Sequence, residues 1–218
     1  MVNAVHSVKK RSVSPGWRRV QRVSGLLLAT FVGVHLTNHL MAGISPAAHV
    51  AFMTATRMVY RHPVVETVLL AAVTLQMITG LRLVGSVTWV SADAWSRLRV
   101  GSGLYLALFL IIHVGAVVTG RLILHLDTNL YFGAAGLNHY PHQLFFVPYY
   151  SLAILSFLAH VAAIHRMKMN RSVANVSPLR QAQFILALGV VLAFGVLYGM
   201  TNRFRGLPVP AQYFILTP

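Results

Sequence analysis

Long apolar runs separated by short polar stretches dominate the chain. A helix that crosses about 30 Å of hydrocarbon needs roughly 20 residues, since each residue adds about 1.5 Å. Five runs reach that length, at residues 23–42, 63–84, 100–120, 144–164 and 181–201. The pattern therefore predicts an all-α polytopic membrane bundle of five transmembrane helices within residues 17–201. Residues 1–16 form a basic cytoplasmic tail in this scheme, and residues 202–218 an outer tail.

Two connections between these runs are longer than a minimal turn. Residues 43–62 join the first run to the second and are expected to contain a short helix lying along the membrane surface. Residues 121–143 join the third run to the fourth and are rich in Gly, Asn, His and Tyr. Because loops of this length usually carry structure of their own, we expect an ordered loop that covers the bundle.

Charge gives the direction of the chain across the membrane. Charged residues make up only 10% of the 218, and 18 Lys and Arg stand against 3 Asp and Glu. Thirteen of the 18 basic residues fall on the side of the N-terminal stretch, and five fall on the other side. The positive-inside rule then predicts a multi-pass protein of the inner (cytoplasmic) membrane, with the N-terminus cytoplasmic and the C-terminus outside. The basic charge reflects topology and contact with anionic lipids, and no nucleic-acid partner is expected.

The histidines carry the candidate chemistry, because the chain has 11 of them and no cysteine. The absence of cysteine excludes Cys-ligated iron–sulfur clusters and covalently attached haem within this chain. His35 lies about 12 residues into the first run and His113 about 13 into the third, which runs in the same direction; both are then about 18–20 Å from the inner boundary. Two imidazoles at one depth would suit axial ligation of a b-type haem.

Other interpretations of these histidines stay open. A histidine inside a bundle can instead bond to a backbone carbonyl or a hydroxyl, and His39, one turn beyond His35, is a competing ligand. His160, near the inner end of the fourth run, lacks a histidine partner of equal depth, because the second run offers Gln76 there. His160 is therefore either a ligand or a hydrogen-bonded residue of the bundle.

Two further polar groups lie toward the outer side. The connection at 121–143 holds a group that would either bind zinc or copper or form a polar cap over a haem edge or quinone pocket: His125, Asp127, His139 and His142. Glu66 is the only acidic residue within an apolar run. It could relay protons to an outer site, but we expect it to pair with Arg61 or Arg57 at the interface.

Four short pieces of sequence are similar to one known family: Arg22-Val23-Ser24-Gly25, His35-Leu36, Gln76 with Gly80-Leu81-Arg82, and His113 with His160. On these pieces the chain resembles the single-chain, five-helix membrane-anchor cytochrome b subunits of succinate dehydrogenase and fumarate reductase. The resemblance covers about residues 17–201. The chain departs from the family pattern at Gln21 and Gln76, where the family has histidine.

The resemblance implies a cofactor and two sites. His35 and His113 would be the axial ligands of an outer haem b, and His160 would be the remnant of an inner site that has lost its partner. One haem at most is expected, and possession of none is the alternative. Ser24 would donate a hydrogen bond to a quinone carbonyl, and Arg22 would stabilise the reduced, anionic form.

The resemblance also implies a role within a succinate:quinone oxidoreductase-type complex. A flavoprotein and an iron–sulfur protein on the cytoplasmic side would oxidise the dicarboxylate, and this chain would pass electrons to membrane quinone. One alternative is a haem-free scaffold or assembly subunit of a larger complex, and another is the cytochrome b of a different dehydrogenase. A transporter is disfavoured, because the runs lack broken helices and paired internal acids.

Overall fold

In a computed structural model the chain is described over residues 15–84 and 92–214. The basic tail expected at residues 1–16 lies almost wholly outside these ranges, and Lys9, Lys10 and Arg11 lie outside them entirely. The long helices are α1 (Pro15–Met41), α3 (Pro63–Val84), α4 (Ala94–Leu122), α6 (Gln143–Lys168) and α7 (Pro178–Met200). These five are long and apolar enough to span a membrane, which confirms the five predicted spans.

Local sequence signals set where the helices begin. Ser177 accepts a hydrogen bond from the Arg180 backbone N–H at the start of α7, and Pro178 occupies the first turn, where its missing N–H costs nothing. Asp93 caps α4 in the same way, accepting from the backbone N–H groups of Trp95 and Ser96. Such polar caps satisfy backbone donors at the ends of the spans, where the chain leaves the apolar layer.

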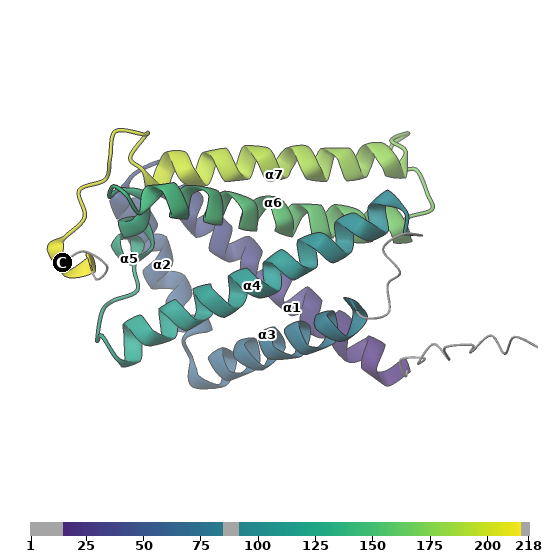
Figure 1. Cartoon of the computed structure of the whole chain (residues 1–218), viewed down its shortest axis with the longest axis horizontal. Helices are drawn as coiled ribbons and strands as arrows, with labels where there is room; N and C mark the ends of the chain where they lie inside the picture. The colour runs from purple at the N-terminus through teal and green to yellow at the C-terminus, as the bar shows by residue number, and fades with distance from the viewer. Residues whose placement is uncertain (1–14, 85–91, 215–218) are drawn as a thin grey trace, which may run out of the picture.

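The contacts between the five spans form a closed ring. Going round it, α1 packs on α7, α7 on α6, α6 on α4, α4 on α3, and α3 on α1 again. α1 and α4 are therefore not neighbours but lie on opposite sides, with α4 in front of α1 in Figure 1. Any side chains of α1 and α4 that point toward each other meet inside the ring.

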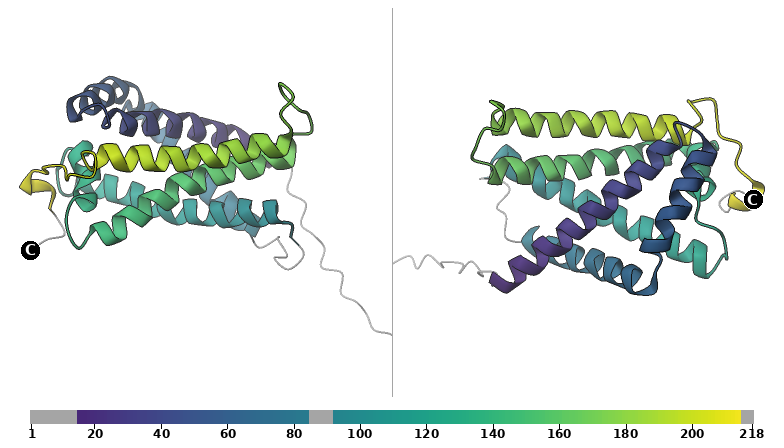
Figure 2. Two further views of the ribbon diagram at one scale, coloured as in Figure 1. Left: turned by 90° about the horizontal axis from the view of Figure 1, so that it is seen from above. Right: turned by 180° about the vertical axis from the view of Figure 1, so that it is seen from behind.

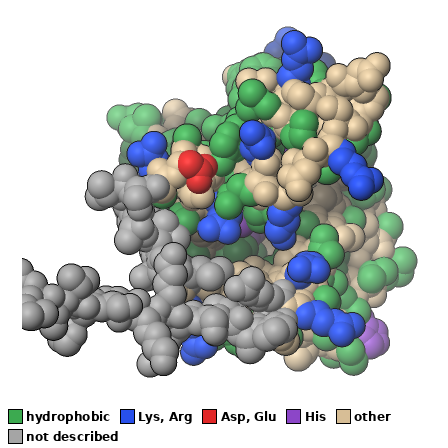
Figure 3. Space-filling model, turned by 90° about the vertical axis from the view of Figure 1, so that its right-hand side faces the viewer, with side chains coloured by type: hydrophobic (Ala, Val, Ile, Leu, Met, Phe, Trp, Pro, Cys, Tyr) green, Lys and Arg blue, Asp and Glu red, His purple; other side chains and the backbone are tan. Residues whose placement is uncertain are grey.

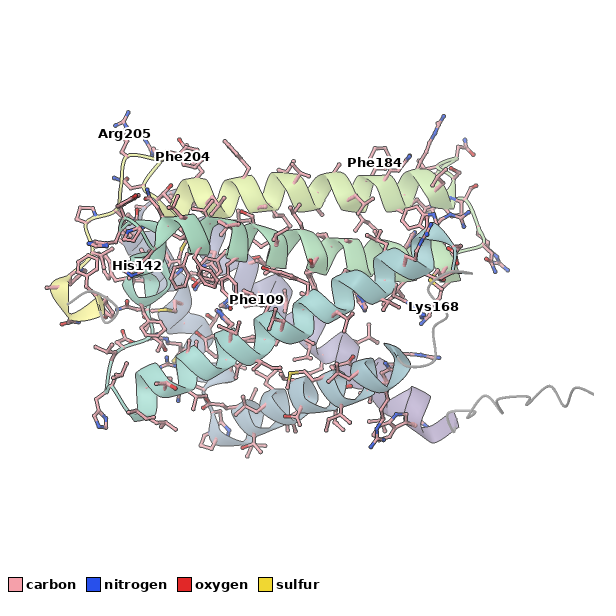
Figure 4. The ribbon with its side chains drawn as sticks, in the orientation of Figure 1. Phe109, His142, Lys168, Phe184, Phe204 and Arg205 are labelled. Atoms are coloured by element: carbon pink, nitrogen blue, oxygen red, sulfur yellow. The ribbon has the colours of Figure 1, made fainter. Side chains whose placement is uncertain are left out.

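The outer surface of the ring is apolar, as lipid contact requires. Large hydrophobic side chains on α7 are exposed, among them Phe184, Val191 and Phe194, and Phe184 points away from the bundle in Figure 4. Lys168 and Arg205 lie at opposite ends of the molecule in the same view. We call these ends the Pro15 end, where α1 begins, and the Met200 end, where α7 finishes.

Short helices close the Met200 end. α2 (Pro46–Tyr60) runs across the bundle axis between the ends of α1 and α3, which confirms the helix expected within residues 43–62 (Figure 2). α5 (Leu130–Ala134) and η1 (Ala135–Leu137) form the ordered loop expected at 121–143. The chain after α7 returns over this loop: Asn138 donates to the Met200 carbonyl and accepts from the Leu207 backbone N–H. A last short helix, η2 (Ala211–Tyr213), completes the cover.

The best-packed part of the bundle is the α6–α7 side. Buried residues from α5, α6 and α7 form one apolar core that includes Leu130, Leu158 and Val196. α1 joins this core at its end, where Gly199 of α7 lies so close to Gly43 that a Cβ atom on Gly199 would come within 2.6 Å of the Gly43 nitrogen. This contact ties the end of α1, and with it the segment leading into α2, to α7.

Candidate functional site

Four histidines from three helices gather inside the bundle toward the Met200 end. His35 and His39 come from α1, His49 from α2 and His113 from α4. The ring centres of His35 and His113 are 6.0 Å apart, those of His35 and His39 are 4.5 Å apart, and those of His39 and His49 are 5.5 Å apart. We refer to these four residues as the histidine cluster. The structure thus brings together the two histidines predicted at matching depth.

Aromatic side chains pack against the imidazole rings of His35 and His113. Phe31, one turn before His35, stacks on it with ring centres 5.7 Å apart. Phe109, one turn before His113, stacks on that ring at 5.0 Å and 15°. Tyr150 of α6 meets the His113 ring edge-on, with centres 6.4 Å apart. Each imidazole is therefore packed against a phenylalanine one turn before it on the same helix.

An apolar cavity of about 240 Å³ lies beside this site, between α4 and α6. Phe109, Tyr105, Pro148 and Tyr149 are among its lining residues. The phenol groups in this lining donate to backbone carbonyls, Tyr105 to the Tyr149 oxygen at 3.0 Å and Tyr149 to the Phe109 oxygen at 3.3 Å. Phe109, seen near the middle of α4 in Figure 4, therefore separates the cavity from His113.

Several ring nitrogens of the cluster have no hydrogen-bond partner within the described chain. They are Nδ1 of His39 and both nitrogens of His49, all buried. His49 is 1% exposed, and burial, followed by the charges of His35 and Arg57, lowers its pKa to about 4. An unpartnered polar group in an apolar interior is costly, so the few found in native proteins call for an explanation such as a ligand, an ion or bound water.

A metal ion requires its ligands in a fixed arrangement. Among the described residues, no group of three or more His, Cys, Asp or Glu side chains is arranged to hold a metal ion. The His35–His113 pair is a different arrangement, of two imidazole rings from α1 and α4 at an interplanar angle of 71°. Metal–imidazole bonds are about 2 Å long, so two imidazoles on opposite sides of one iron have ring centres about 6 Å apart. The observed 6.0 Å fits this requirement.

One contact within the cluster competes with ligation. Nε2 of His35 lies 3.1 Å from Nε2 of His39, a hydrogen-bond distance. Ligation through Nε2 of His35 therefore requires one of these two side chains to turn. The same contact places His39 one turn from His35 on the inner side of α1, as the sequence predicted for a competing ligand.

The two residues expected at an inner site are bonded to different helices. Nδ1 of His160 lies 2.9 Å from the Arg99 carbonyl and 3.3 Å from the Ser102 hydroxyl, both on α4. Gln76 donates instead to α1, through Nε2 to the Gln21 carbonyl at 2.6 Å and to the Ser24 hydroxyl at 2.8 Å. His160 thus makes the bonds of a residue of the bundle, one of the two interpretations left open by the sequence.

The expected quinone residues differ in exposure. Ser24 is buried; its hydroxyl donates to the Val20 carbonyl at 2.9 Å and accepts from Gln76. A quinone at Ser24 would have to replace one of these bonds. Arg22 is exposed near the Pro15 end of α1, where its charge is available to a ligand or a headgroup.

Glu66 has a different partner from the one expected. Its carboxylate forms an ion pair with Arg121, at the end of α4, and not with Arg61 or Arg57. The expectation was wrong because it used closeness in sequence. α3 and α4 run antiparallel side by side, which places the first turn of α3 against the last turn of α4.

The four polar residues singled out at 121–143 do not all lie together. Asp127 pairs with Arg57, with 2.8 Å between Oδ1 and Nη1, and His125 is exposed. The rings of His139 and His142 lie 5.5 Å apart, near the residues that follow α7. Within the described ranges, this group therefore does not gather into an arrangement that could hold a metal ion.

Sequence reasoning did not single out His49, Phe31 or Phe109. The sequence offered one signal for His49: it stands four residues before Met53, a spacing that puts both on one face of a helix. The structure buries these two residues of α2. A histidine on the buried face of a short surface helix indicates contact with the bundle interior. Phe31 and Phe109 each precede a candidate ligand by four residues, a spacing that stacks side chains on a helix.

No protein-family model, curated protein or solved structure matches the chain. The geometry of the site therefore carries the functional inference.

Proposed function

We propose that this chain is a membrane-anchor, cytochrome b-like subunit that holds one b-type haem between His35 and His113 and exchanges electrons with membrane quinone. The observation that supports this most directly is the 6.0 Å spacing of the two imidazole rings across the interior of the ring of helices. The resemblance to succinate:quinone oxidoreductase anchors supplies the class of complex. In that setting the electrons come from an iron–sulfur subunit next to a flavoprotein.

The chain's own residues account for how such a group would be held. His35 would offer an imidazole nitrogen from α1 once its contact with His39 is released, and His113 would offer one from α4; Phe31 and Phe109 stack on those rings. Both imidazoles lie inside the ring of helices, in a setting that would enclose the macrocycle of such a group. A haem bound there supplies a one-electron carrier. His39 remains available to replace His35 as the ligand from α1.

Two positions for quinone follow from different observations. The resemblance places it near Ser24 and Arg22, toward the Pro15 end. The apolar cavity between α4 and α6 is a second position, because it opens beside Phe109, which stacks on His113. A quinone there would be separated from the ligand by a single aromatic ring.

The proposed partners would bind at the Pro15 end. Lys and Arg side chains are spread over that end of the molecule in Figure 3. The described basic residues there come from α1, α3, α4, α6, the α6–α7 connection and the first turn of α7: Arg19, Arg22, Arg82, Arg97, Arg99, Arg166, Lys168, Arg171 and Arg180. The positive-inside rule puts this end in the cytoplasm, where the iron–sulfur and flavoprotein subunits would dock.

A haem-free scaffold is the second candidate function, and one observation favours it. The side chains at the other expected ligand positions already have protein partners, since Gln76 bonds to α1 and His160 to α4. Such satisfied contacts would hold a bundle together without a cofactor.

The proposed function is tested by asking whether quinol reduces a haem in the purified protein. Addition of a short-chain quinol should produce the reduced b-type spectrum in the unaltered protein and in the His160→Ala variant. The His113→Ala variant should show no such reduction. Flavin that co-purifies with the chain would support the dehydrogenase complex, whereas haem reduction without flavin would favour the cytochrome b of another enzyme. Absence of haem from the unaltered protein would favour the scaffold.

A further inference from the structure

Three arginines converge at the Met200 end, beside the histidine cluster. Arg57 is on α2, Arg61 follows α2 directly, and Arg121 is in the last turn of α4. They are close enough to act on one another: burial, and then the charges of Arg57 and Arg121, hold the pKa of Arg61 below its ordinary value. Like charges gathered in a partly buried place are unfavourable unless anions compensate them.

The acidic side chains nearby compensate this charge only in part. Glu66 is bound to Arg121, and Asp127 reaches Arg57 through a single 2.8 Å contact while remaining half exposed. Within the described residues, no carboxylate lies within ion-pair distance of Arg61. The group as a whole therefore has more positive than negative charge.

Arg57 and Arg61 also have guanidinium N–H donors available for a further acceptor. Nη2 of Arg61 donates to the Thr128 hydroxyl at 2.6 Å, and Nη2 of Arg57 donates to the Thr128 carbonyl at 2.8 Å. Both acceptors are neutral oxygens. Nε of Arg57 is buried and has no acceptor in the part of the chain that the structure describes. Because a guanidinium has five N–H donors, both side chains can take a further anion.

One electrostatic interaction and one chain of ring contacts connect this arginine pair to the histidine cluster. Arg57 follows His49 by eight residues on α2, close enough for its charge to act on that ring. Tyr60 meets Phe31 edge-on with ring centres 5.6 Å apart, and Phe31 stacks on His35. The arginine pair therefore borders the histidine cluster on its Met200 side.

We propose that Arg57 and Arg61 bind the two carboxylate groups of the haem held by His35 and His113; the inference rests on the proposed function. A b-type haem carries both of its carboxylates on one edge, and an apolar interior requires cations for them. Guanidinium groups match carboxylates in shape and charge. Arg121 at this end is already paired with Glu66, and Arg203 and Arg205 are exposed on the segment after α7.

The test uses the haem-loaded protein, with haem that is ¹³C-labelled at its carboxyl groups. Two quantities are measured: the rate of haem transfer to excess apomyoglobin, and the position of the labelled carboxylate band in the reduced-minus-oxidised infrared spectrum. Arg57→Gln and Arg61→Gln should each speed haem loss by about tenfold, since a charged hydrogen bond is removed, and should shift the labelled band. Arg205→Gln, an exposed arginine at the same end, should change neither quantity.

The infrared band separates binding from a merely structural effect. Faster haem loss with an unshifted band in both variants would assign these arginines to another anion, such as a lipid phosphate, and would overturn the inference. Arg57→Lys should retain part of the shift, because it keeps the charge and loses the fork of donors. If the unaltered protein holds no haem, the proposed function fails as well. If it holds haem whose band is insensitive to both arginines, the proposed function stands and this inference fails.

Discussion

The rings of His35 and His113 lie with their centres 6.0 Å apart, although their helices are not neighbours in the ring of spans. The pairing therefore depends on the way α3, α6 and α7 separate α1 from α4 and leave both rings pointing inward. Each ring is stacked on a phenylalanine of its own helix, so the orientation of both is set locally as well.

The link between α1 and α3 should be structural. Ser24→Ala and Gln76→Leu each remove the hydrogen bond between the two side chains, which lies inside the bundle. Each change is expected to lower the free energy of unfolding by about 1 kcal/mol. Thermal unfolding in detergent measures this loss. Quinol reduction of the haem should be unchanged in Ser24→Ala if Ser24 only joins the helices, and its loss would place the quinone at Ser24.

The ion pair between Glu66 and Arg121 should be detectable as coupling between the two residues. Both side chains are partly exposed, so the coupling is expected to be below about 1 kcal/mol. A double-mutant cycle with Glu66→Gln and Arg121→Gln measures it from unfolding free energies. The matched cycle pairs Glu66→Gln with Arg61→Gln and should be additive. Coupling to Arg61 that exceeds the coupling to Arg121 would restore the partner expected from sequence.

The stability of the haem-free protein should depend on pH through His49. Its pKa is lowered from 6.5 to about 4 by burial and by the charges of His35 and Arg57. Between these values the unfolded chain binds a proton that the folded chain does not, so stability falls as pH falls from 6.5 toward 4. The melting temperature, measured at several pH values, should therefore decline over this interval.

His49→Leu should flatten that decline, because it removes the titrating group. The same variant should be at least as stable as the unaltered protein at pH 7, since both imidazole nitrogens lack partners in the described structure. Exposed His125, replaced by leucine, serves as the control and should leave the pH profile as it was. An equally steep decline in the His49→Leu variant would show that other groups cause it.

The orientation of the chain can be measured with single cysteines, because the sequence has none of its own. Arg171, between α6 and α7, and Arg205, after α7, are both exposed and lie at opposite ends. In intact cells an impermeant maleimide should label the Arg205→Cys variant, and it should label Arg171→Cys only after the membrane is permeabilised. The reverse pattern would place the Pro15 end outside.

The spans could be predicted from the sequence because a helix that crosses the bilayer needs an apolar run of about 20 residues. The matching depth of His35 and His113 followed from the same signal, since equal offsets along parallel spans give equal depth. The partner of Glu66 was missed because it depends on which spans lie side by side, and periodicity does not carry that information. The position of His49 was missed for a related reason. Its contact with His39 depends on how α2 crosses the end of the bundle.

The reduced-minus-oxidised visible spectrum of the purified protein tests the central claim most directly, with His35→Ala, His113→Ala and His39→Ala measured beside it. The account predicts a b-type α-band that is lost in the His35 and His113 variants and kept in His39→Ala and in the His160→Ala control. A band lost in His39→Ala but kept in His35→Ala would move the α1 ligand by one turn. A native protein without any haem band would contradict the account.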